Sequence, residues 1–422
     1  MPAVRRACAL SDGTTAMTRI VQKFGGTSLA DIEKIRSAAR HVQRAVNAGN
    51  EVAVVVSAMA GTTSKLVSWA REISALHDAR EYDAVVASGE QVTAGLMAMA
   101  IQGLGIPARS WLAWQLPIIT DDVHGKAHIE SIDTTEIVQR LTAGEVAVIP
   151  GFQGVSHRDR LTTLGRGGSD ASAVALTAAL HADLCNIYTD VDGVYTSDPN
   201  IVTKARKLDK ITYEEMLEMA SLGAHVLQGR AAELAMRHHV VVQVLSAFDN
   251  LPGTQLVDED VIVEQRVVSG IAYSRDEAKI TLTGIPDRPG IAASIFGPLS
   301  EASVNVDMIV QNASDDGASA DLTFTVGKAD LARATEVIGQ ARDILGYQEL
   351  LSDSNVVKVS VIGVGMRTHA GVATKMFETL ADKGINIQVI STSEIKVSVL
   401  IAEEYTELAL RSLHTAYDLD EE

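Results

Sequence analysis

A glycine-rich loop at residues 162–172 constrains the fold of this chain more than any other stretch of its sequence. The loop lies between a β-like run at 146–152 and an apolar helical run at 173–180. Its glycines let backbone N–H groups turn inward, and the following helix directs the positive end of its dipole at the loop. Arg166 adds a planar fork that suits a carboxylate or a phosphate. The pattern predicts an anion-binding loop, with a glycine-rich turn and an ordinary helix cap as the alternative.

The same order of strand, glycine turn and helix occurs at the start of the chain. A β-like run at 20–24 ends in Gly25 and Gly26, and apolar residues then recur at helical spacing from Ile32 to Val46. Lys23 therefore ends a strand beside a phosphate-sized loop, where its ammonium can neutralise phosphoryl oxygens. The alternative is a solvated surface lysine.

Polar residues follow two further β-like runs. Residues 52–56 are almost continuously β-branched, as in a strand buried on both faces, and they lead into a turn that begins with Ser57. The run at 184–189 ends in an acidic turn that begins with Asp190. Ligands bind at the carboxyl edge of parallel sheets, so both turns are candidate ligand contacts. A helical stretch at 82–104 carries Glu90, either an exposed charge or an anchor for a substrate amino group.

Alternating β-like and helical runs from residue 18 to about 250 predict an α/β fold with a mainly parallel sheet covered on both faces by helices. Residues 111–120 are one of the predicted strands. A proline-glycine pair at 252–253 and an acidic run at 258–260 mark the end of this first domain, predicted at 18–257. Residues 1–17 lack a clear pattern and are predicted to be a disordered extension.

An internal repeat follows the first domain. Residues 279–285 match 358–364, and residues 304–306 match 385–387. Each copy reads as strand, glycine loop, helix and strand with a further strand after them, which predicts two ferredoxin-like βαββαβ modules at 263–345 and 346–422. Such modules can pair their edges and bind ligands where helix N-termini meet strands. A duplicated dimerisation module without a ligand is the alternative.

Composition limits the partners and the compartment. The formal net charge of −18 argues against nucleic acid or an anionic membrane as a partner. Two cysteines, Cys8 and Cys185, provide neither a disulfide framework nor a metal cluster, which predicts a cytoplasmic protein without metal ligands of its own. No apolar run reaches about 18 residues, so no membrane span is predicted.

Taken together, several motifs resemble those of the aspartokinases of the amino acid kinase superfamily. They are Lys23-Phe24-Gly25-Gly26-Thr27-Ser28, Val56-Ser57-Ala58-Met59, Ser88-Gly89-Glu90, Gly151-Phe152-Gln153-Gly154, Thr163-Leu164-Gly165-Arg166-Gly167-Gly168-Ser169-Asp170 and Tyr188-Thr189-Asp190-Val191-Asp192-Gly193-Val194-Tyr195. The repeat resembles the two ACT regulatory modules of that family. The resemblance extends from residue 18 to about 417.

The resemblance implies ATP-dependent phosphorylation of the β-carboxylate of L-aspartate to 4-phospho-L-aspartate. This reaction is the first step towards lysine, threonine, methionine and diaminopimelate. In this reading Lys23 neutralises charge on the transferring phosphoryl group and Asp170 organises that lysine and the phosphates. Arg166 clamps the α-carboxylate of the substrate, and Glu90 binds its amino group.

The resemblance also implies the remaining contacts. Further aspartate contacts are Ser57, Thr63, Phe152 and Ser169. The ATP contacts are Lys23, Phe24, Gly25, Gly26, Ser169, Thr189, Asp190, Tyr195 and His225. Mg²⁺ is expected to be held mostly by phosphates and water.

Two positions depart from the family. Gly223-Ala224-His225 stands where many members have Gly-Ala-Lys, and Ala127-His128-Ile129 stands where members usually have Ala-Arg-Ile. Histidine is mostly neutral near pH 7, so two cations are lost around an anionic site and weaker ATP binding is predicted. A catalytically weak, amino-acid-sensing homologue is therefore an alternative. Another amino acid kinase, acting on glutamate or acetylglutamate, is a second.

The ACT resemblance implies feedback regulation by lysine, threonine or both, and a homo-oligomer joined through the ACT modules. The effector is expected at junctions between modules. The residues implied are Asp287, Gly290, Ile291, Ala292, Asn305, Asp307 and Gln311 of one module and Asn386 and Ile387 of the other.

Overall fold

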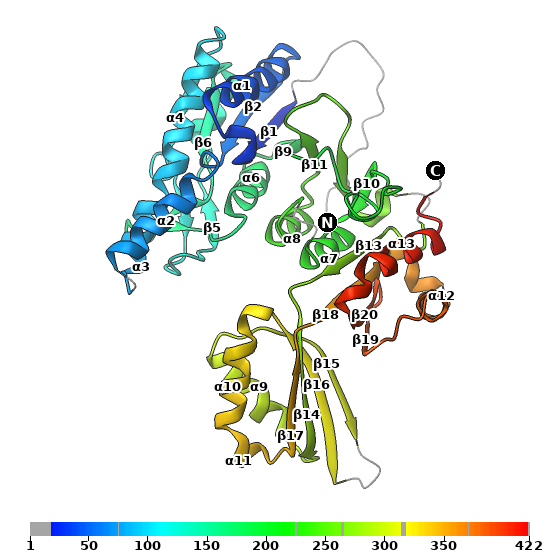
Figure 1. The fold of residues 1–422 in the computed structure, drawn as a ribbon. Coiled ribbons are helices and arrows are strands. Elements are labelled where there is room, and N and C mark those ends of the chain that lie inside the picture. The colour runs from blue at the N-terminus through cyan, green and yellow to red at the C-terminus, as the bar shows by residue number, and fades with distance from the viewer. Residues whose placement is uncertain are drawn as a thin grey trace, which may run out of the picture. The chain divides into compact units, whose positions relative to one another are not determined.

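The computed structural model describes residues 18–74, 76–223, 226–262, 266–313, 318–369 and 371–420 (Figure 1). The predicted extension at 1–17 and the predicted ATP contact His225 lie outside these residues. The chain forms two units. The first unit contains the residues up to Asp192 together with Arg237–Leu251, and the second contains Gly193–Met236 and Pro252–Glu422.

A parallel sheet forms the centre of the first unit. Its strands lie in the order β11-β9-β1-β2-β6-β3, and every neighbouring pair is parallel, which confirms the predicted mainly parallel sheet. The strands are β1 (Arg19–Phe24), β2 (Glu51–Val56), β3 (Ala108–Ser110), β6 (Val146–Pro150), β9 (Leu184–Thr189) and β11 (Val242–Ser246). The central strands β2 and β6 are almost entirely apolar, and β1, β2 and β6 are all buried on both faces, as expected where helices cover both sides.

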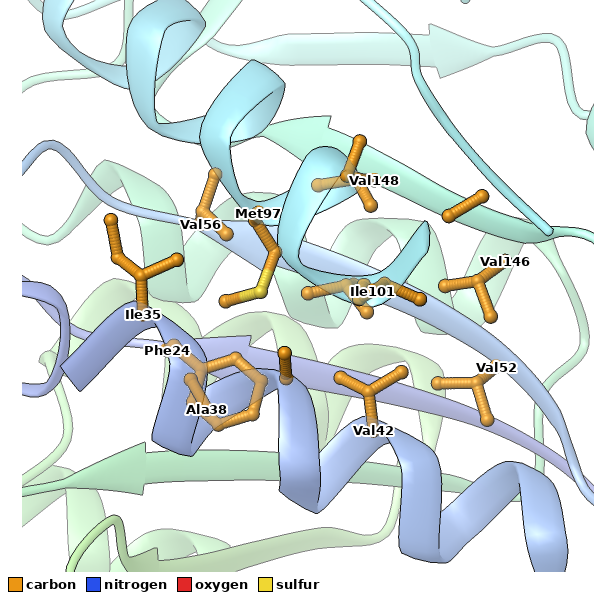
Figure 2. Packing of buried hydrophobic residues seen from close by; sticks show 14 of the residues in the cluster. Phe24, Ile35, Ala38, Val42, Val52, Val56, Met97, Ile101, Val146 and Val148 are labelled. Atoms are coloured by element: carbon orange, nitrogen blue, oxygen red, sulfur yellow. The ribbon is translucent and has the colours of Figure 1, made fainter. Parts of the chain in front are cut away.

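Helices α1 (Ile32–Asn47) and α4 (Ser88–Gln102) cover one face of this sheet. Figure 2 shows the apolar side chains of the two helices packed against those of the strands; the labelled helix residues are Ile35, Ala38, Val42, Met97 and Ile101, and the labelled strand residues are Phe24, Val52, Val56, Val146 and Val148. Helix α6 (Gly168–Ala179) contacts β1 and β2 from the other face. Because consecutive strand residues point to opposite faces, Phe24 lies in the α1 and α4 core while Lys23 faces α6.

The first unit contains further helices and a second sheet. They are η1 (Thr27–Leu29), α2 (Thr62–Ile73), α3 (Ala79–Val86), α5 (Thr135–Thr142) and a four-stranded sheet of order β5-β4-β7-β8, made of β4 (Ile118–Thr120), β5 (Ile129–Ile132), β7 (Gln153–Ser156) and β8 (Leu161–Thr163). The helical stretch Ala79–Gln102 is long and apolar enough to cross a membrane, but half of its most apolar window is buried inside the protein, as in a core helix.

The predicted strand at 111–120 is mostly wrong. Only β3, which ends at Ser110, and β4, which starts at Ile118, are strands in this region. Between them the N–H groups of Gln115 and Leu116 both donate to the carbonyl of Leu112, at 2.8 and 3.0 Å. These helix-like hydrogen bonds form a turn, so an apolar run that suits a buried strand is instead a turn in which Trp114 and Gln115 are exposed.

Two four-stranded antiparallel sheets make up most of the second unit. One has the order β15-β16-β14-β17 and the other the order β13-β18-β20-β19. Their strands are β13 (Gly270–Ser274), β14 (Ala278–Pro286), β15 (Val306–Ala313), β16 (Ser319–Val326), β17 (Glu349–Asp353), β18 (Val356–Ile362), β19 (Val389–Thr392) and β20 (Lys396–Ala402). The helices and 3₁₀ turns are α9 (Ile291–Glu301), η3 (Lys328–Asp330), α10 (Leu331–Gln340), α11 (Arg342–Leu345), η4 (Val364–Thr368), α12 (Val372–Asp382), η5 (Glu403–Tyr405) and α13 (Thr406–Ala416).

The two sheets are nested rather than consecutive in the chain. The first module runs from β14 to β17, whereas the second combines β18–β20 with β13, a strand that precedes the first module. The linear division at 345 and 346 therefore differs from the observed strand pairing. The physical reason is that β13 pairs along its own full length with β18, from Gly270 opposite Ile362 to Ser274 opposite Lys358.

The segment Gly193–Met236 belongs with these modules in the second unit. Its elements are β10 (Lys210–Thr212), α7 (Tyr213–Ser221) and the first part of α8 (Gly229–His238), and β10 pairs with β12 (Thr254–Val257) next to η2 (Glu259–Val261). Buried Glu215 caps α7 and also accepts hydrogen bonds from the Ser269 hydroxyl at 2.5 Å and the Val364 N–H at 3.0 Å. One carboxylate thus ties α7 to the second ACT sheet.

Candidate active site

An ion pair lies at the carboxyl end of the central strand. The Lys23 ammonium at the end of β1 is 2.5 Å from a carboxylate oxygen of Asp170, in the first turn of α6. Each residue has only 7% of its surface exposed. A pair this buried holds both side chains in place and keeps a positive charge at the end of the sheet.

Two glycine residues lie in the turn beside the Lys23 ammonium. The Gly25 N–H donates to the Tyr188 carbonyl at 3.1 Å, so the turn after β1 is fixed to β9. A Cβ on Gly25 would lie 3.5 Å from the Lys23 nitrogen, and a Cβ on Gly26 would lie 3.0 Å from the Ala58 carbonyl oxygen. Glycine at these two positions leaves room for an anionic group beside the ammonium.

The glycine-rich loop approaches the same strand end through close backbone packing. A Cβ on Gly151 would lie 2.9 Å from the Ser169 Cα, so only glycine lets the turn after β6 rest on the first turn of α6. Phe152 follows with φ at 69°, and its N–H donates to the Ser172 hydroxyl at 3.0 Å. The structure therefore packs the turn that carries Phe152 against the first turn of α6, which carries Ser169.

Arg166 is placed differently from the two buried charges. It lies in the loop between β8 and α6, and its side chain is exposed. Within the described part of the chain it forms no recorded ion pair. Its guanidinium is thus available to a ligand, whereas Ser169 and Asp170 are buried in the helix that follows.

Glu90 is a buried carboxyl group in the first turn of α4. Only 3% of its surface is exposed, and its Oε1 accepts from the Ala58 N–H at 3.1 Å. Its Oε2 is buried and has no hydrogen-bond partner among the described residues. Burial raises the pKa of Glu90 to about 7. An oxygen of this kind is suited to receive a charged donor such as an ammonium.

The other predicted contacts of the first unit lie in turns at strand ends. Ser57 follows β2 and donates its N–H to the Phe24 carbonyl at 3.1 Å, and half-buried Thr63 is in the first turn of α2. At the end of β9, the Thr189 hydroxyl donates to Asp190 at 3.1 Å. Since β9 pairs with β1, this turn is the neighbour of the Lys23 turn. Tyr195 belongs to the second unit, where it forms a β-bridge with Lys207.

Two features lie apart from this arrangement. His128, one of the departures from the family pattern, has 68% of its side chain exposed and pairs with Asp121 at 2.8 Å. A cavity of about 500 Å³ is lined by Asp78, Ala79, Arg80, Asp122, His124, Arg158 and Arg160, none of which is a predicted site residue. Sequence reasoning also missed Asp83, a fully buried carboxylate that accepts a hydrogen bond from Thr163 at the start of the glycine-rich loop.

The predicted regulatory residues lie in two parts of the second unit. Gly290, with φ at 90°, caps the N-terminus of α9, where Asp287 and Ala292 are exposed and Ile291 is buried. The second group consists of Asn305 before β15, Asp307 and Gln311 on β15, and Asn386 and Ile387 before β19. Strands β15 and β19 contact each other, so these residues lie where the two modules meet.

Asp307 already holds an ammonium in this structure. Its carboxylate accepts from Lys358 at 2.7 Å, and the same lysine pairs with Glu277 at 2.6 Å. Burial alone would lower the pKa of Lys358, but the two carboxylates raise it. An effector ammonium that uses Asp307 therefore has to share it with Lys358 or displace it.

Comparisons with known proteins show the family of this chain. The model of the amino acid kinase family matches residues 18–246, and that of an ACT domain matches 280–341 and 359–417. The chain is 54% identical to the aspartokinase of Pseudomonas aeruginosa over 406 residues, 96% of this chain and 98% of that protein. It is 46% identical to the aspartokinase of Mycolicibacterium smegmatis over 408 residues, 96% of this chain and 97% of that protein.

Solved structures show the same relationship. The structure of E. coli aspartokinase III in complex with aspartate and ADP matches with a TM-score of 0.78 and 25% identity, over 94% of this chain and 99% of that one. Its complex with lysine and aspartate matches with a TM-score of 0.75 and 26% identity, over 94% and 98%. From the family model and from relatives matched along almost their whole length, the chain belongs to the aspartokinases, the aspartate kinases of the amino acid kinase family.

Proposed function

We propose that this enzyme transfers the γ-phosphoryl group of ATP to the β-carboxylate of L-aspartate, giving 4-phospho-L-aspartate and ADP. The observation that carries the proposal is the buried pair of Lys23 and Asp170 beside two glycine turns. It is supported by the likeness to an aspartokinase solved with aspartate and ADP. The product is the first intermediate towards lysine, threonine, methionine and diaminopimelate.

The chemistry needs positioning and charge neutralisation rather than a general base. A β-carboxylate oxygen of aspartate forms a bond to the γ-phosphorus while the bond from that phosphorus to the β,γ-bridging oxygen breaks, and ADP leaves. The nucleophile is already an anion, so no proton has to be removed. Lys23 stabilises the charge that develops on the phosphoryl oxygens, and Asp170 holds its ammonium in place.

Arg166 and Glu90 would recognise the α-amino acid head of aspartate. The exposed Arg166 guanidinium offers two parallel donors to the α-carboxylate. The unpartnered Oε2 of Glu90 accepts from the ammonium group. Ser57, Thr63, Phe152 and Ser169 would line the rest of the pocket.

ATP would lie along the turns that follow β1 and β9. Phe24, Gly25, Gly26, Thr189 and Asp190 belong to these turns, both in the first unit. Among the described residues no group of three or more His, Cys, Asp or Glu side chains could hold a metal ion. We expect phosphate oxygens and water to supply most ligands of Mg²⁺, which neutralises phosphate charge when bound.

Lysine, threonine or both would inhibit the enzyme through the ACT modules. An aspartokinase solved with lysine supports lysine as an effector. The predicted residues on α9, β15 and the loop before β19 would form the site, with the α9 N-terminus receiving an α-carboxylate. The segment that carries Tyr195 shares a unit with these modules. Inhibition requires that the effector bind the inactive state more tightly.

We place the enzyme in the cytoplasm, as a homo-oligomer of full-length chains joined through edge strands of the ACT modules. Strands β15 and β17 are the edges of the first module, and β13 and β19 those of the second. Edge strands expose unpaired backbone groups that a second copy can pair with.

A coupled ADP-release assay tests the function. Aspartate, glutamate and acetylglutamate are supplied separately, each with and without lysine and threonine. The proposal predicts turnover with aspartate, little with the other two, and inhibition by lysine or threonine. Turnover only with glutamate or acetylglutamate would assign another amino acid kinase. Effector binding without turnover would assign an amino-acid-sensing homologue.

A further inference from the structure

Asp83 is a buried carboxylate that no step described so far uses. It lies in α3 with 0% of its surface exposed. Its Oδ1 accepts from the Thr163 hydroxyl at 2.6 Å, and its Oδ2 accepts from His124 Nδ1 at 2.7 Å and from the Gly125 N–H at 3.1 Å. Three polar groups, from Thr163, His124 and Gly125, thus converge on one buried carboxyl group.

These groups belong to two segments that meet beside Arg166. Thr163 is the last residue of β8, three residues before Arg166, and its carbonyl accepts from the Ala127 N–H at 2.9 Å. Gly165, with φ at 77°, passes so close to Gly125 that a Cβ would lie 3.1 Å from the Gly125 oxygen. Asp83 therefore holds both sides of the contact between the turn at 124–127 and the start of the glycine-rich loop.

The rest of the loop is anchored as well. The Leu164 N–H donates to the Phe152 carbonyl at 2.9 Å, and the Gly168 N–H donates to the Gly165 carbonyl at 3.0 Å as α6 begins. The backbone is thus fixed on both sides of Arg166, while the Arg166 side chain is exposed. The fixed backbone therefore limits the positions that the Arg166 guanidinium can reach.

The same corner of the fold carries Glu90. Helices α3 and α4 are separated only by Ala87, whose carbonyl accepts from the Gln153 side chain at 3.0 Å. Gln91, next to Glu90, donates to the Gln153 side chain at 3.2 Å. Glu90 therefore lies on α4, directly after α3. Asp83 on α3 fixes the loop that carries Arg166.

We propose that Asp83 is a positioning residue for aspartate recognition. Through Thr163 and Gly125 it sets the distance between Arg166, which takes the α-carboxylate, and Glu90, which takes the ammonium. Asp83 itself touches no substrate atom. The inference rests on the proposed roles of Arg166 and Glu90 in the aspartate kinase reaction.

Matched variants test this role. Asp83→Ala and Thr163→Val remove the hydrogen bond that holds the loop, and we expect each to raise the aspartate KM about tenfold or more while the ATP KM stays unchanged. Asp83→Asn can reverse its amide and donate to the Thr163 oxygen, and Thr163→Ser keeps the hydroxyl, so both should stay near the parent KM. Asp78→Asn, which keeps an N-cap on the same helix, is the control and should change neither KM.

A double-variant cycle separates positioning from general damage. If Asp83 acts through Arg166, Thr163→Val should add little to the aspartate KM of Arg166→Ala, because the group it positions is already gone. Thermal unfolding shows which variants fold, and Thr163→Val decides the matter if Asp83→Ala does not fold. A folded Thr163→Val enzyme with an unchanged aspartate KM, or with both KM values raised equally, would overturn the inference. An unchanged aspartate KM in Arg166→Ala would instead contradict the proposed function.

Discussion

The Lys23 ammonium lies 2.5 Å from the Asp170 carboxylate, and the two buried side chains come from β1 and α6, on the same face of the central sheet. Lys23→Met keeps much of the side-chain volume but removes the charge. We expect kcat to fall about 100-fold or more, because the ammonium stabilises charge that develops in the transition state. Steady-state turnover at saturating aspartate and ATP measures this effect, and near-parent turnover would rule out the assigned role.

The same variant should also lose stability, since Asp170 is left as a buried anion without its cation. Breaking one side of a buried pair costs about 3–5 kcal/mol. The double variant Lys23→Met with Asp170→Asn should recover most of that stability and none of the activity. Chemical denaturation of both variants separates the structural contribution of the pair from its catalytic one.

Arg166→Ala should raise the aspartate KM by about 10- to 100-fold, the range expected for losing charged hydrogen bonds. Arg166→Lys keeps the charge but lacks the planar fork, so its aspartate KM should lie between those of the parent and the alanine variant. The ATP KM is the internal control in both. Equal effects of the two substitutions would argue against a bidentate clamp.

Glu90 predicts a pH dependence of aspartate binding. Its pKa is raised to about 7 by burial, and the ionised form is the one that accepts the substrate ammonium. The value of kcat/KM for aspartate should therefore rise with pH up to about 7 and level off above it. Glu90→Gln should lower kcat/KM and abolish this rise. A pH profile of the parent that is flat from pH 6 to 8 would contradict the role.

The same pKa shift predicts the pH dependence of stability. The folded-state pKa of Glu90 lies above its ordinary value of 4.5, so between about pH 4.5 and 7 the folded protein binds a proton that the unfolded chain has lost. The free energy of unfolding should therefore fall as pH rises through this window. In Glu90→Gln this contribution disappears, and denaturation curves at pH 5 and pH 8 should differ less than in the parent.

Gln311→Ala should relieve inhibition by lysine or threonine and leave uninhibited turnover unchanged. Gln311 is exposed on β15, far along the chain from the catalytic residues, and loss of its hydrogen bonds should weaken effector binding several-fold to tenfold. Asp307→Ala should act in the same direction, with Glu277 still pairing with Lys358. Inhibition curves that match the parent for both variants would place the effector elsewhere.

His225→Lys should lower the ATP KM without changing the aspartate KM. The reason is the family pattern, in which a lysine stands at this position and brings a full positive charge to the polyphosphate. Full kinetics with ATP as the varied substrate measure the effect. An unchanged or raised ATP KM would mean that the site is adapted to histidine or that this residue does not meet the nucleotide.

Local pattern was enough to predict the parallel sheet and the elements that carry Lys23 and Asp170. Glycine turns after apolar runs mark strand ends, and helical spacing follows each of them. The contact between Lys23 and Asp170 was expected only from the family resemblance, since it joins residues far apart in the chain. Asp83 left no recognisable signal, because an acid in an apolar helical stretch looks the same whether it is exposed or holds three polar groups.

Pairing between strands that are distant in the chain was the other feature that could not be predicted from the sequence. The repeat at 279–285 and 358–364 predicted two modules, but nothing in the local sequence of β13 indicates that it pairs with β18 across the whole first module. Periodicity likewise could not separate a buried strand from the turn that follows Trp111, since both are apolar. Asn386 and Ile387, matched to a strand of the first copy, precede β19 in the structure.

The most direct test of the central claim is the identity of the product. The enzyme is incubated with ATP, Mg²⁺ and L-aspartate, the acyl phosphate is trapped with hydroxylamine, and the hydroxamate is identified by mass spectrometry against the two authentic isomers. The account predicts the β-hydroxamate of aspartate in amounts equal to the ADP released, and its loss in Lys23→Met. The α-hydroxamate, or ADP release without any aspartate hydroxamate, would contradict it.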